Sequence, residues 1–293
     1  VNDLPNNVNL GSCNMYADDT IIYTTGKDID EVKNNLQSSV DHASAWYDAN
    51  KLVVNASKSN VMLIRTPHMV RKEPNLCLDI MLKDVNLDQV DRCTYLGVTL
   101  DDTLSWEPQI NKTCKQLGCK IQYLKKAKAL KLSKEALLDI YQTKIQPVID
   151  YALTVWGAVP KYQLKRVQHL QNYAARLILD NFDYINTNGI YLVKQLNIMN
   201  IEERLTYFEN LMAFKGIHGL APPYLCNQFD LRNEIVERNL RGHPLDLYYR
   251  KASGYKEKSV VFRSSVGWNN QPAEVKDNIN LNSYKKALKS YIL

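Results

Sequence analysis

The sequence predicts an α+β fold, with strands and one long helix in the N-terminal third and mostly helices in the rest of the chain. Two short apolar runs flank a tight turn between Asn14 and Thr25, which is typical of a β-hairpin. Apolar residues then recur at three- and four-residue steps from Ile29 to Trp46, which predicts an amphipathic helix. The same helical spacing dominates from residue 105 onward, so the second part of the chain is expected to be helical.

Shorter elements are expected to complete the N-terminal third. Asp28 or Asp30 can cap the first long helix, because an aspartate side chain accepts hydrogen bonds from the free N–H groups of the first turn. The other elements expected here are short strands at 51–54 and 61–64, an irregular or strand-like segment at 67–90 with a turn near Asp84, and a strand at 95–100.

Helical periodicity divides the remainder of the chain into five predicted helices. They cover residues 105–129, 133–156, 160–180, 189–197 and 200–216. The predicted breaks fall at residues 181–183 and at the Gly219–Pro223 stretch, where glycine and proline interrupt the helical pattern.

Two adjacent carboxylates, Asp18 and Asp19, stand at the turn of the first predicted hairpin. Such a pair repels itself unless a cation neutralises it, so it favours a divalent-metal site with oxygen ligands, for which Mg²⁺ is the usual occupant and Mn²⁺ an alternative. Aspartate is also common at turns for purely conformational reasons. The two residues alone leave both interpretations open, and the flanking sequence must decide between them.

The flanking sequence resembles one known family. Tyr16-Ala17-Asp18-Asp19 is similar to the signature tetrapeptide of reverse transcriptases, and Asp3-Leu4-Pro5 resembles a segment of the non-LTR (LINE-type) retrotransposon enzymes. The resemblance extends over the whole chain. It also covers the following blocks: Trp46–Ser59 (the next palm motif), Tyr95–Leu100 (the primer-grip hairpin), and Ile145–Tyr151 with Trp156, Leu170–Arg176 and Trp268–Pro272 (the region after the polymerase core).

This resemblance implies that the chain has three parts. Residues 1–103 would be the C-terminal part of the palm, an antiparallel sheet with a helix that includes the primer grip. Residues 104–180 would be a helical thumb-like domain, and residues 181–293 a helical, basic post-thumb region that ends in a helix at 283–291. In the family, the first metal-binding aspartate lies upstream of these segments. We therefore expect an incomplete copy or fragment that lacks the fingers and is inactive alone.

The activity implied by the resemblance is RNA-directed DNA synthesis by two-metal nucleotidyl transfer. Its partners are an RNA template, a DNA primer and, in the full-length protein, a dNTP. Asp18 would bind metal directly, Asp19 would be a second ligand or support the primer end, and Tyr16 would border the nucleotide or the primer terminus.

Three further residues receive weaker roles from the same resemblance. Lys58 could offer a proton or a positive charge to the departing pyrophosphate, or it could simply lie in solvent at the end of a strand. Leu96 and Gly97 would seat the primer backbone, because glycine permits close approach.

Charge is distributed unevenly along the chain. Residues 1–103 carry 9 Lys/Arg and 15 Asp/Glu, whereas residues 104–293 carry 28 and 16. No acidic residue occurs between Pro108 and Lys134, and this segment favours salt-sensitive contact with a phosphate backbone. A solvated helix face opposite an apolar stripe would explain the same pattern. The candidate nucleic-acid-binding residues are Lys112, Lys115, Lys120, Lys125, Lys126, Lys128, Lys131 and Lys134.

The tail at residues 224–293 also mixes basic and aromatic residues. This mixture suits stacking on unpaired bases, but it equally suits a small subdomain anchored by tyrosines with basic residues in solvent. The residues concerned are Arg232, Arg238, Arg241, Arg250, Lys251, Lys256, Lys258 and Arg263, with Tyr248, Tyr249, Tyr255, Phe262 and Trp268.

Bulk properties indicate an intracellular protein, nuclear and/or cytoplasmic, with no membrane partner. The chain has no run of eighteen apolar residues, which a transmembrane helix would need. Its first residues also lack the basic start and the apolar core of a signal peptide. Its 6 cysteines are scattered and are expected to be free thiols. Besides the polymerase, a non-catalytic nucleic-acid-binding remnant fits the sequence, and a maturase-like splicing factor fits less well. A full-length element protein is a candidate partner.

Overall fold

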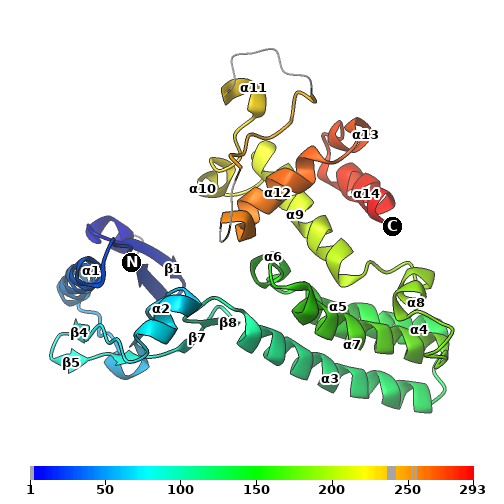
Figure 1. The fold of residues 1–293 in the computed structure, drawn as a ribbon, viewed down its shortest axis with the longest axis horizontal. Coiled ribbons are helices and arrows are strands. Elements are labelled where there is room, and N and C mark those ends of the chain that lie inside the picture. Colours follow the sequence, from blue (N-terminus) through cyan, green and yellow to red (C-terminus); the bar gives the residue numbers. More distant parts are fainter. Residues whose placement is uncertain (1–2, 236–241, 252–253, 255) are drawn as a thin grey trace. The chain divides into compact units, whose positions relative to one another are not determined.

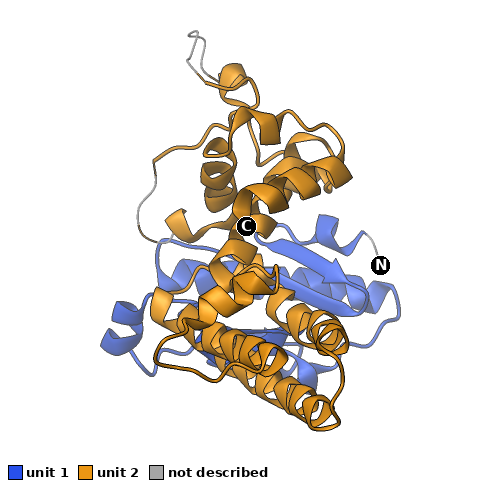
Figure 2. Cartoon of the chain, turned by 90° about the vertical axis from the view of Figure 1, so that its right-hand side faces the viewer, with its two compact units in different colours: residues 1–108 blue, residues 109–293 orange. Residues whose placement is uncertain are grey.

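The computed structural model describes residues 3–235, 242–251, 254 and 256–293 of the chain. Two compact units are present, residues 1–108 and residues 109–293 (Figure 2). The named strands all lie in the first unit, and helices build the second (Figure 1). The predicted α+β class is therefore confirmed. None of the helices in the described part of the chain combines the length and hydrophobicity that crossing a bilayer requires.

The first unit is organised around helix α1 (Ile29–Ala49). Asp28 caps it, as predicted, by accepting a hydrogen bond of 2.8 Å from the backbone N–H of Glu31. Near its C-terminal end, α1 buries Ala43 and Trp46 against Leu4 and Val8. Its N-terminal half packs against a second apolar cluster. The residues of that cluster are Ile29, Val32, Leu36 and Val40 of α1 with Val61, Leu63, Leu78 and Ile80.

Among the described residues of this unit, eight short strands form four two-stranded sheets. Three pairs are antiparallel hairpins, and the fourth pair is parallel. The hairpins are β1 (Ser12–Tyr16) with β2 (Asp19–Tyr23), β4 (Met81–Leu82) with β5 (Val85–Asn86), and β7 (Arg92–Tyr95) with β8 (Val98–Asp101); β3 (Asn60–Val61) pairs with β6 (Asp88–Gln89). The second hairpin turns at Lys83 and Asp84, as predicted.

Several predicted elements of the first unit are wrong. Residues 51–54 form no strand, and the Val53 side chain is 95% exposed, so this short apolar run has no sheet to join. Of residues 61–64, only Val61 lies in a strand. Residues 67–72, expected to be irregular, form helix α2 (Pro67–Lys72), with Thr66 as its cap and proline in the first turn, where a missing N–H costs nothing. Short 3-10 helices occur at η1 (Leu4–Asn7) and η2 (Ala56–Lys58).

The second unit consists mainly of helices in its described residues. The longer ones are α3 (Glu107–Ala129), which begins at the end of the first unit, α7 (Lys161–Leu179), α9 (Ile201–Ile217), α12 (Val260–Asn269) and α14 (Leu281–Ile292). The shorter ones are α4 (Lys134–Ile140), η3 (Tyr141–Ile145), α5 (Gln146–Asp150), α6 (Leu153–Trp156), α8 (Gly189–Gln195), α10 (Pro223–Cys226), α11 (Arg232–Ile235), η4 (Lys256–Lys258) and α13 (Ala273–Lys276).

The predicted helix at 133–156 is interrupted twice. Its middle, η3, is a wide π-helical turn that ends two residues before Pro147, whose ring carries no N–H to donate to the preceding turn. Ala152 then takes a left-handed conformation, with φ of 51°, and separates α5 from α6. A single continuous helix was therefore the wrong prediction for this segment.

Buried polar side chains of α7 tie the first part of the second unit together. The Gln171 amide donates 2.9 Å to the hydroxyl of Tyr141 and 3.0 Å to the carbonyl of Met199. Burial raises the pKa of Tyr141 to about 12, so this hydroxyl stays protonated and can act as a hydrogen-bonding group. Arg176 is buried and donates to the carbonyls of Asn181, Asp183 and Thr187. The block at 170–176 thus has a structural role in this fold.

A separate core joins α9, α12 and α14. The ring of Phe214 stacks on that of Tyr284 with centroids 4.2 Å apart, and Trp268 is fully buried beside them. The Trp268 indole N–H donates 2.7 Å to the carbonyl of Leu245. The predicted closing helix at 283–291 lies within α14. Arg238, Arg241 and Tyr255 of the predicted tail set lie outside the described residues.

Candidate catalytic hairpin and nucleic-acid interface

The hairpin of β1 and β2 carries the two adjacent aspartates at its tip. Tyr16 pairs with Asp19 as the last pair of the ladder, so Ala17 and Asp18 form a two-residue turn. Ala17 takes a left-handed conformation with φ of 54°. A residue with a Cβ pays about 1 kcal/mol for this conformation, and such strain is often found at functional sites.

One face of the hairpin is seated on the first unit. Cys13, Met15 and Ile22 contact the apolar cluster that contains Leu4 and Trp46. The opposite face and the tip point into solvent. Tyr16 is 65% exposed, and Ala17, Asp18 and Asp19 are exposed as well. The structure therefore brings Tyr16, Asp18 and Asp19 together at an accessible and well-supported edge.

The carboxylates at this tip are suitable ligands for a hard divalent cation, but they are too few to complete a metal site. Carboxylate oxygens are the ligands that Mg²⁺ and Mn²⁺ prefer, and two of them are adjacent here. Within the described ranges, no group of three or more His, Cys, Asp or Glu side chains is placed to hold a metal ion. A complete two-metal centre needs further ligands besides Asp18 and Asp19.

Lys58 does not belong to the hairpin that carries the two aspartates. It is an exposed residue at the end of η2, not at a strand end. Across the described chain, no hydrogen bond or ion pair joins its side chain to Asp18 or Asp19. Its assignment to the departing pyrophosphate remains a prediction from the resemblance.

The hairpin expected at Tyr95–Leu100 is present, but these residues do not form one strand. Leu96 and Gly97 form the turn between β7 and β8, with φ of 45° and 76°. Two consecutive left-handed residues are the signature of a type I′ turn, which matches the twist of a hairpin. Gly97 therefore has a conformational reason to be glycine, whatever approaches it.

Sequence reasoning missed Asp101, which fixes the start of α3. Its carboxylate accepts hydrogen bonds from the Thr103 hydroxyl at 2.7 Å and from the backbone N–H groups of Ser105 and Trp106 at 3.0 Å each. Burial raises the pKa of Asp101, but these hydrogen bonds outweigh burial and hold the pKa below its ordinary value. The Asp-x-Thr-x-Ser pattern could have indicated this side-chain cap.

The predicted amphipathic pattern of α3 is confirmed. Ile110, Leu117, Ile121 and Leu124 are buried on one side of the helix. Lys115 and Lys126, eleven residues or about three turns apart, are exposed on the opposite side. Lys112 is partly exposed beside them, and Lys131 and Lys134 are exposed beyond the end of α3.

Three other lysines of the predicted set contact neighbouring side chains. The Lys125 ammonium lies 5.1 Å from the ring centre of Tyr173, and that of Lys128 lies 4.8 Å from the ring centre of Phe182. Lys128 also forms an ion pair with Asp180. Lys120 lies 5.9 Å from the ring centre of Tyr123 on its own helix. The eight lysines are therefore not one uniform surface. We call Lys115 and Lys126 the outer lysine pair.

Comparison with protein families identifies the N-terminal part of the chain. Residues 1–100 match the family model of reverse transcriptase (RNA-dependent DNA polymerase). This segment includes the hairpin with Asp18 and Asp19, helix α1 and most of the β7–β8 hairpin. No solved structure matches the chain.

Curated relatives extend the similarity beyond this segment. The probable RNA-directed DNA polymerase from transposon BS of Drosophila melanogaster is 29% identical over 194 residues, which cover 65% of this chain and 21% of that protein. The RNA-directed DNA polymerase from mobile element jockey of the same species is 28% identical over 244 residues, which cover 79% of this chain and 25% of that protein. The chain thus spans a fifth to a quarter of the length of these relatives.

Proposed function

This chain belongs to the reverse-transcriptase family of non-LTR retrotransposons, and we propose that it supplies metal ligands and nucleic-acid contacts to an RNA-directed DNA polymerase. The observation that carries the proposal is the hairpin tip, where Tyr16, Asp18 and Asp19 are exposed within the segment that matches the family. Its partners would be an RNA template, a DNA primer and a dNTP.

Asp18 and Asp19 are proposed to bind Mg²⁺, or Mn²⁺ in its place. Such ions, when bound, neutralise phosphate charge and lower the pKa of an attacking hydroxyl. The chain itself would contribute two carboxylates on a hairpin that is held by its packing against Leu4 and Trp46. Tyr16, which pairs with Asp19, would border the nucleotide or the primer end.

The lysines of α3 and its C-terminal flank are proposed to contact the phosphate backbone. The outer lysine pair, Lys115 and Lys126, is exposed, and neither forms an ion pair with a carboxylate among the described residues. Phosphate contact by such groups is independent of sequence and weakens with salt, because bound counterions are released. Leu96 and Gly97 would contact the primer from the β7–β8 turn.

We expect no primer extension by this chain alone. The two aspartates are not accompanied by a third metal-binding side chain in the part of the chain that the structure describes. A longer element protein that supplies another carboxylate would complete the site. The same observation supports a second candidate function, a non-catalytic nucleic-acid-binding protein, because the outer lysine pair needs no such completion.

Direct detection of Mn²⁺ tests the metal assignment. Mn²⁺ bound to the purified chain is measured by electron paramagnetic resonance in the presence of a primed RNA. The wild-type chain should retain Mn²⁺ that the double variant Asp18→Asn with Asp19→Asn loses. Asp84→Asn is the matched control, since Asp84 is also an exposed aspartate at a hairpin turn. Equal Mn²⁺ binding by the wild type and the double variant would contradict the assignment.

A further inference from the structure

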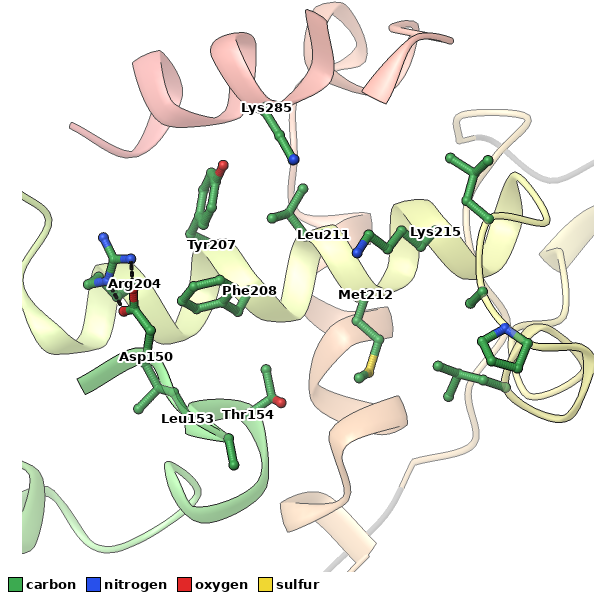
Figure 3. Close-up of a pocket in the computed structure, with 15 residues that line it drawn as sticks. Asp150, Leu153, Thr154, Arg204, Tyr207, Phe208, Leu211, Met212, Lys215 and Lys285 are labelled. Atoms are coloured by element: carbon green, nitrogen blue, oxygen red, sulfur yellow. Dashed lines mark hydrogen bonds and ion pairs between the residues drawn. The ribbon is translucent and has the colours of Figure 1, made fainter. Parts of the chain in front are cut away.

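A pocket of about 620 Å³ lies in the second unit between α5, α6, α9, α10 and α14 (Figure 3). This volume is in the range of small-molecule sites. The residues that line the pocket include none from the β1–β2 hairpin and none of the candidate lysines on α3. Its lining combines an apolar wall with two lysines, and each part restricts what the pocket can bind.

The apolar wall comes mainly from one side of α9. Tyr207, Phe208, Leu211 and Met212 line it, and the Tyr207 and Phe208 rings meet edge to face with centroids 5.6 Å apart. Tyr207 and Phe208 are only partly buried, and the guanidinium of Arg204 lies over the Phe208 ring, 5.3 Å from its centre, so Tyr207 is the ring left for a ligand to stack on. Two adjacent aromatic rings beside a methionine form a surface that suits a flat, apolar group.

The charges around the pocket are not balanced. Arg204 is paired with Asp150 through two hydrogen bonds, so the charges of these two residues cancel. Lys215 of α9 and Lys285 of α14 form no ion pair or hydrogen bond with another side chain among the described residues. Figure 3 shows the Lys285 side chain extending from α14 toward α9, between Tyr207 and Leu211. A ligand with negative charge would compensate both lysines.

We propose that this pocket binds one unpaired nucleotide of a single-stranded nucleic acid. The base would stack on the ring of Tyr207 with its edge against Phe208, whose ring stands at 73° to that of Tyr207, and the phosphates on either side would contact Lys215 and Lys285. A nucleotide combines the two properties that the lining selects, a flat aromatic group and adjacent phosphate charge. The inference rests on the proposed function for the choice of a strand over a free nucleotide. The pocket itself is separate from the proposed duplex contacts on α3.

The test uses a single-stranded RNA that contains the fluorescent base 2-aminopurine, whose emission falls when it stacks on an aromatic ring. Titration of the full chain should quench this emission. The double variant Lys215→Glu with Lys285→Glu should weaken binding about tenfold or more, because both phosphate contacts become repulsive. The double variant Lys286→Glu with Lys289→Glu is the matched control. It makes the same charge change on exposed positions of α14 that do not line the pocket.

Equal weakening by both double variants, or no weakening by the pocket variant, would overturn the proposal. So would binding of free 2-aminopurine nucleoside monophosphate as tight as that of the strand. Circular dichroism of each variant establishes that it is folded. A blunt-ended RNA–DNA duplex is titrated in parallel, and the pocket variant should weaken its binding less than it weakens that of the single strand, because the duplex has no unpaired nucleotide for the pocket. If the wild-type chain does not bind this duplex, the proposed function itself is refuted.

Discussion

The hydroxyl oxygen of Tyr47 lies 3.1 Å from the hydroxyl oxygen of Thr20, so helix α1 is hydrogen-bonded to the strand that carries Asp19. Tyr47 also meets the ring of Trp46 edge to face, with centroids 5.4 Å apart. Trp46 in turn donates from its indole N–H to the carboxylate of Asp3 at 3.2 Å. These contacts connect the N-terminal segment, α1 and the hairpin that carries Asp18 and Asp19 into one packed group.

Replacing Tyr47 with phenylalanine should loosen the hairpin while leaving the core intact. The variant loses one hydrogen bond, which is worth about 1 kcal/mol. Amide hydrogen exchange should accelerate in β1 and β2 and remain unchanged in the second unit. Tyr23→Phe is the control, because Tyr23 lies on the exposed face of the same hairpin and no hydrogen bond of its hydroxyl is recorded. Faster exchange in both variants would show that the Thr20 contact is not responsible.

Replacing Ala17 with glycine should stabilise the first unit. The left-handed conformation of Ala17 is strained, and glycine relieves this strain by about 0.5–1 kcal/mol. Thermal unfolding should therefore shift to higher temperature. Ala45→Gly is the control with the opposite expected sign, because Ala45 is exposed in the interior of α1, where glycine costs about 1 kcal/mol. Destabilisation by Ala17→Gly would contradict the observed turn geometry.

Replacing Arg176 with lysine should destabilise the second unit despite the retained charge. The Arg176 guanidinium donates to three backbone carbonyls between Asn181 and Thr187, which a lysine cannot reach together. The expected loss is about 2–3 kcal/mol in urea unfolding, with faster proteolysis between residues 181 and 187. Arg166→Lys is the control, because Arg166 is exposed and contacts only the side chain of Asn111 among the recorded hydrogen bonds. A loss no larger than that of the control would refute this role.

The buried pair of Glu209 and Arg263 predicts a dependence of stability on pH. The carboxylate lies 2.8 Å from the guanidinium, and Arg263 offsets only part of the cost of burial, which raises the pKa of Glu209 to about 6. In the unfolded chain the pKa of a glutamate is about 4.3. The folded state therefore binds the proton more tightly. The stability from this group is fully present below about pH 4.3 and is lost as the pH rises through about 6.

Unfolding of the wild type and of Glu209→Gln at pH 4.5 and pH 7 isolates this contribution. The wild type should lose about 2 kcal/mol over this interval from Glu209. The variant should lack this part of the pH dependence, since its amide does not titrate. Equal pH dependence of the two proteins would show that the pKa of Glu209 is not raised by folding.

Hydrophobic periodicity correctly predicted the elements whose own residues contain the signals for their structure. The helix from Ile29 has both an apolar stripe and an aspartate cap, and the first hairpin has a turn between two apolar runs. The strand predicted at 51–54 did not form, because a short and largely apolar run becomes a strand only where a partner strand lies beside it. The interruption at η3 and Ala152 was missed because Pro147 was its only sequence signal.

The candidate site was predictable to a similar extent. The sequence located Asp18 and Asp19 at a hairpin tip, and the structure places them there. It could not separate Lys128 from Lys126, because Asp180 and Phe182 approach Lys128 only through the packing of α3 near the end of α7. The role of Asp101 also depends on three-dimensional hydrogen bonds, although its local pattern was visible in the sequence.

The salt dependence of binding to an RNA–DNA primer-template tests the proposed lysine interface most directly. The double variant Lys115→Ala with Lys126→Ala should reduce the slope of log affinity against log salt by about 2, one for each lost phosphate contact. Lys125→Ala with Lys128→Ala is the matched control on the same helix, and it should change the slope less, because those lysines contact Tyr173, Phe182 and Asp180. An unchanged slope in the first variant, or an equal change in both, would contradict the proposed interface.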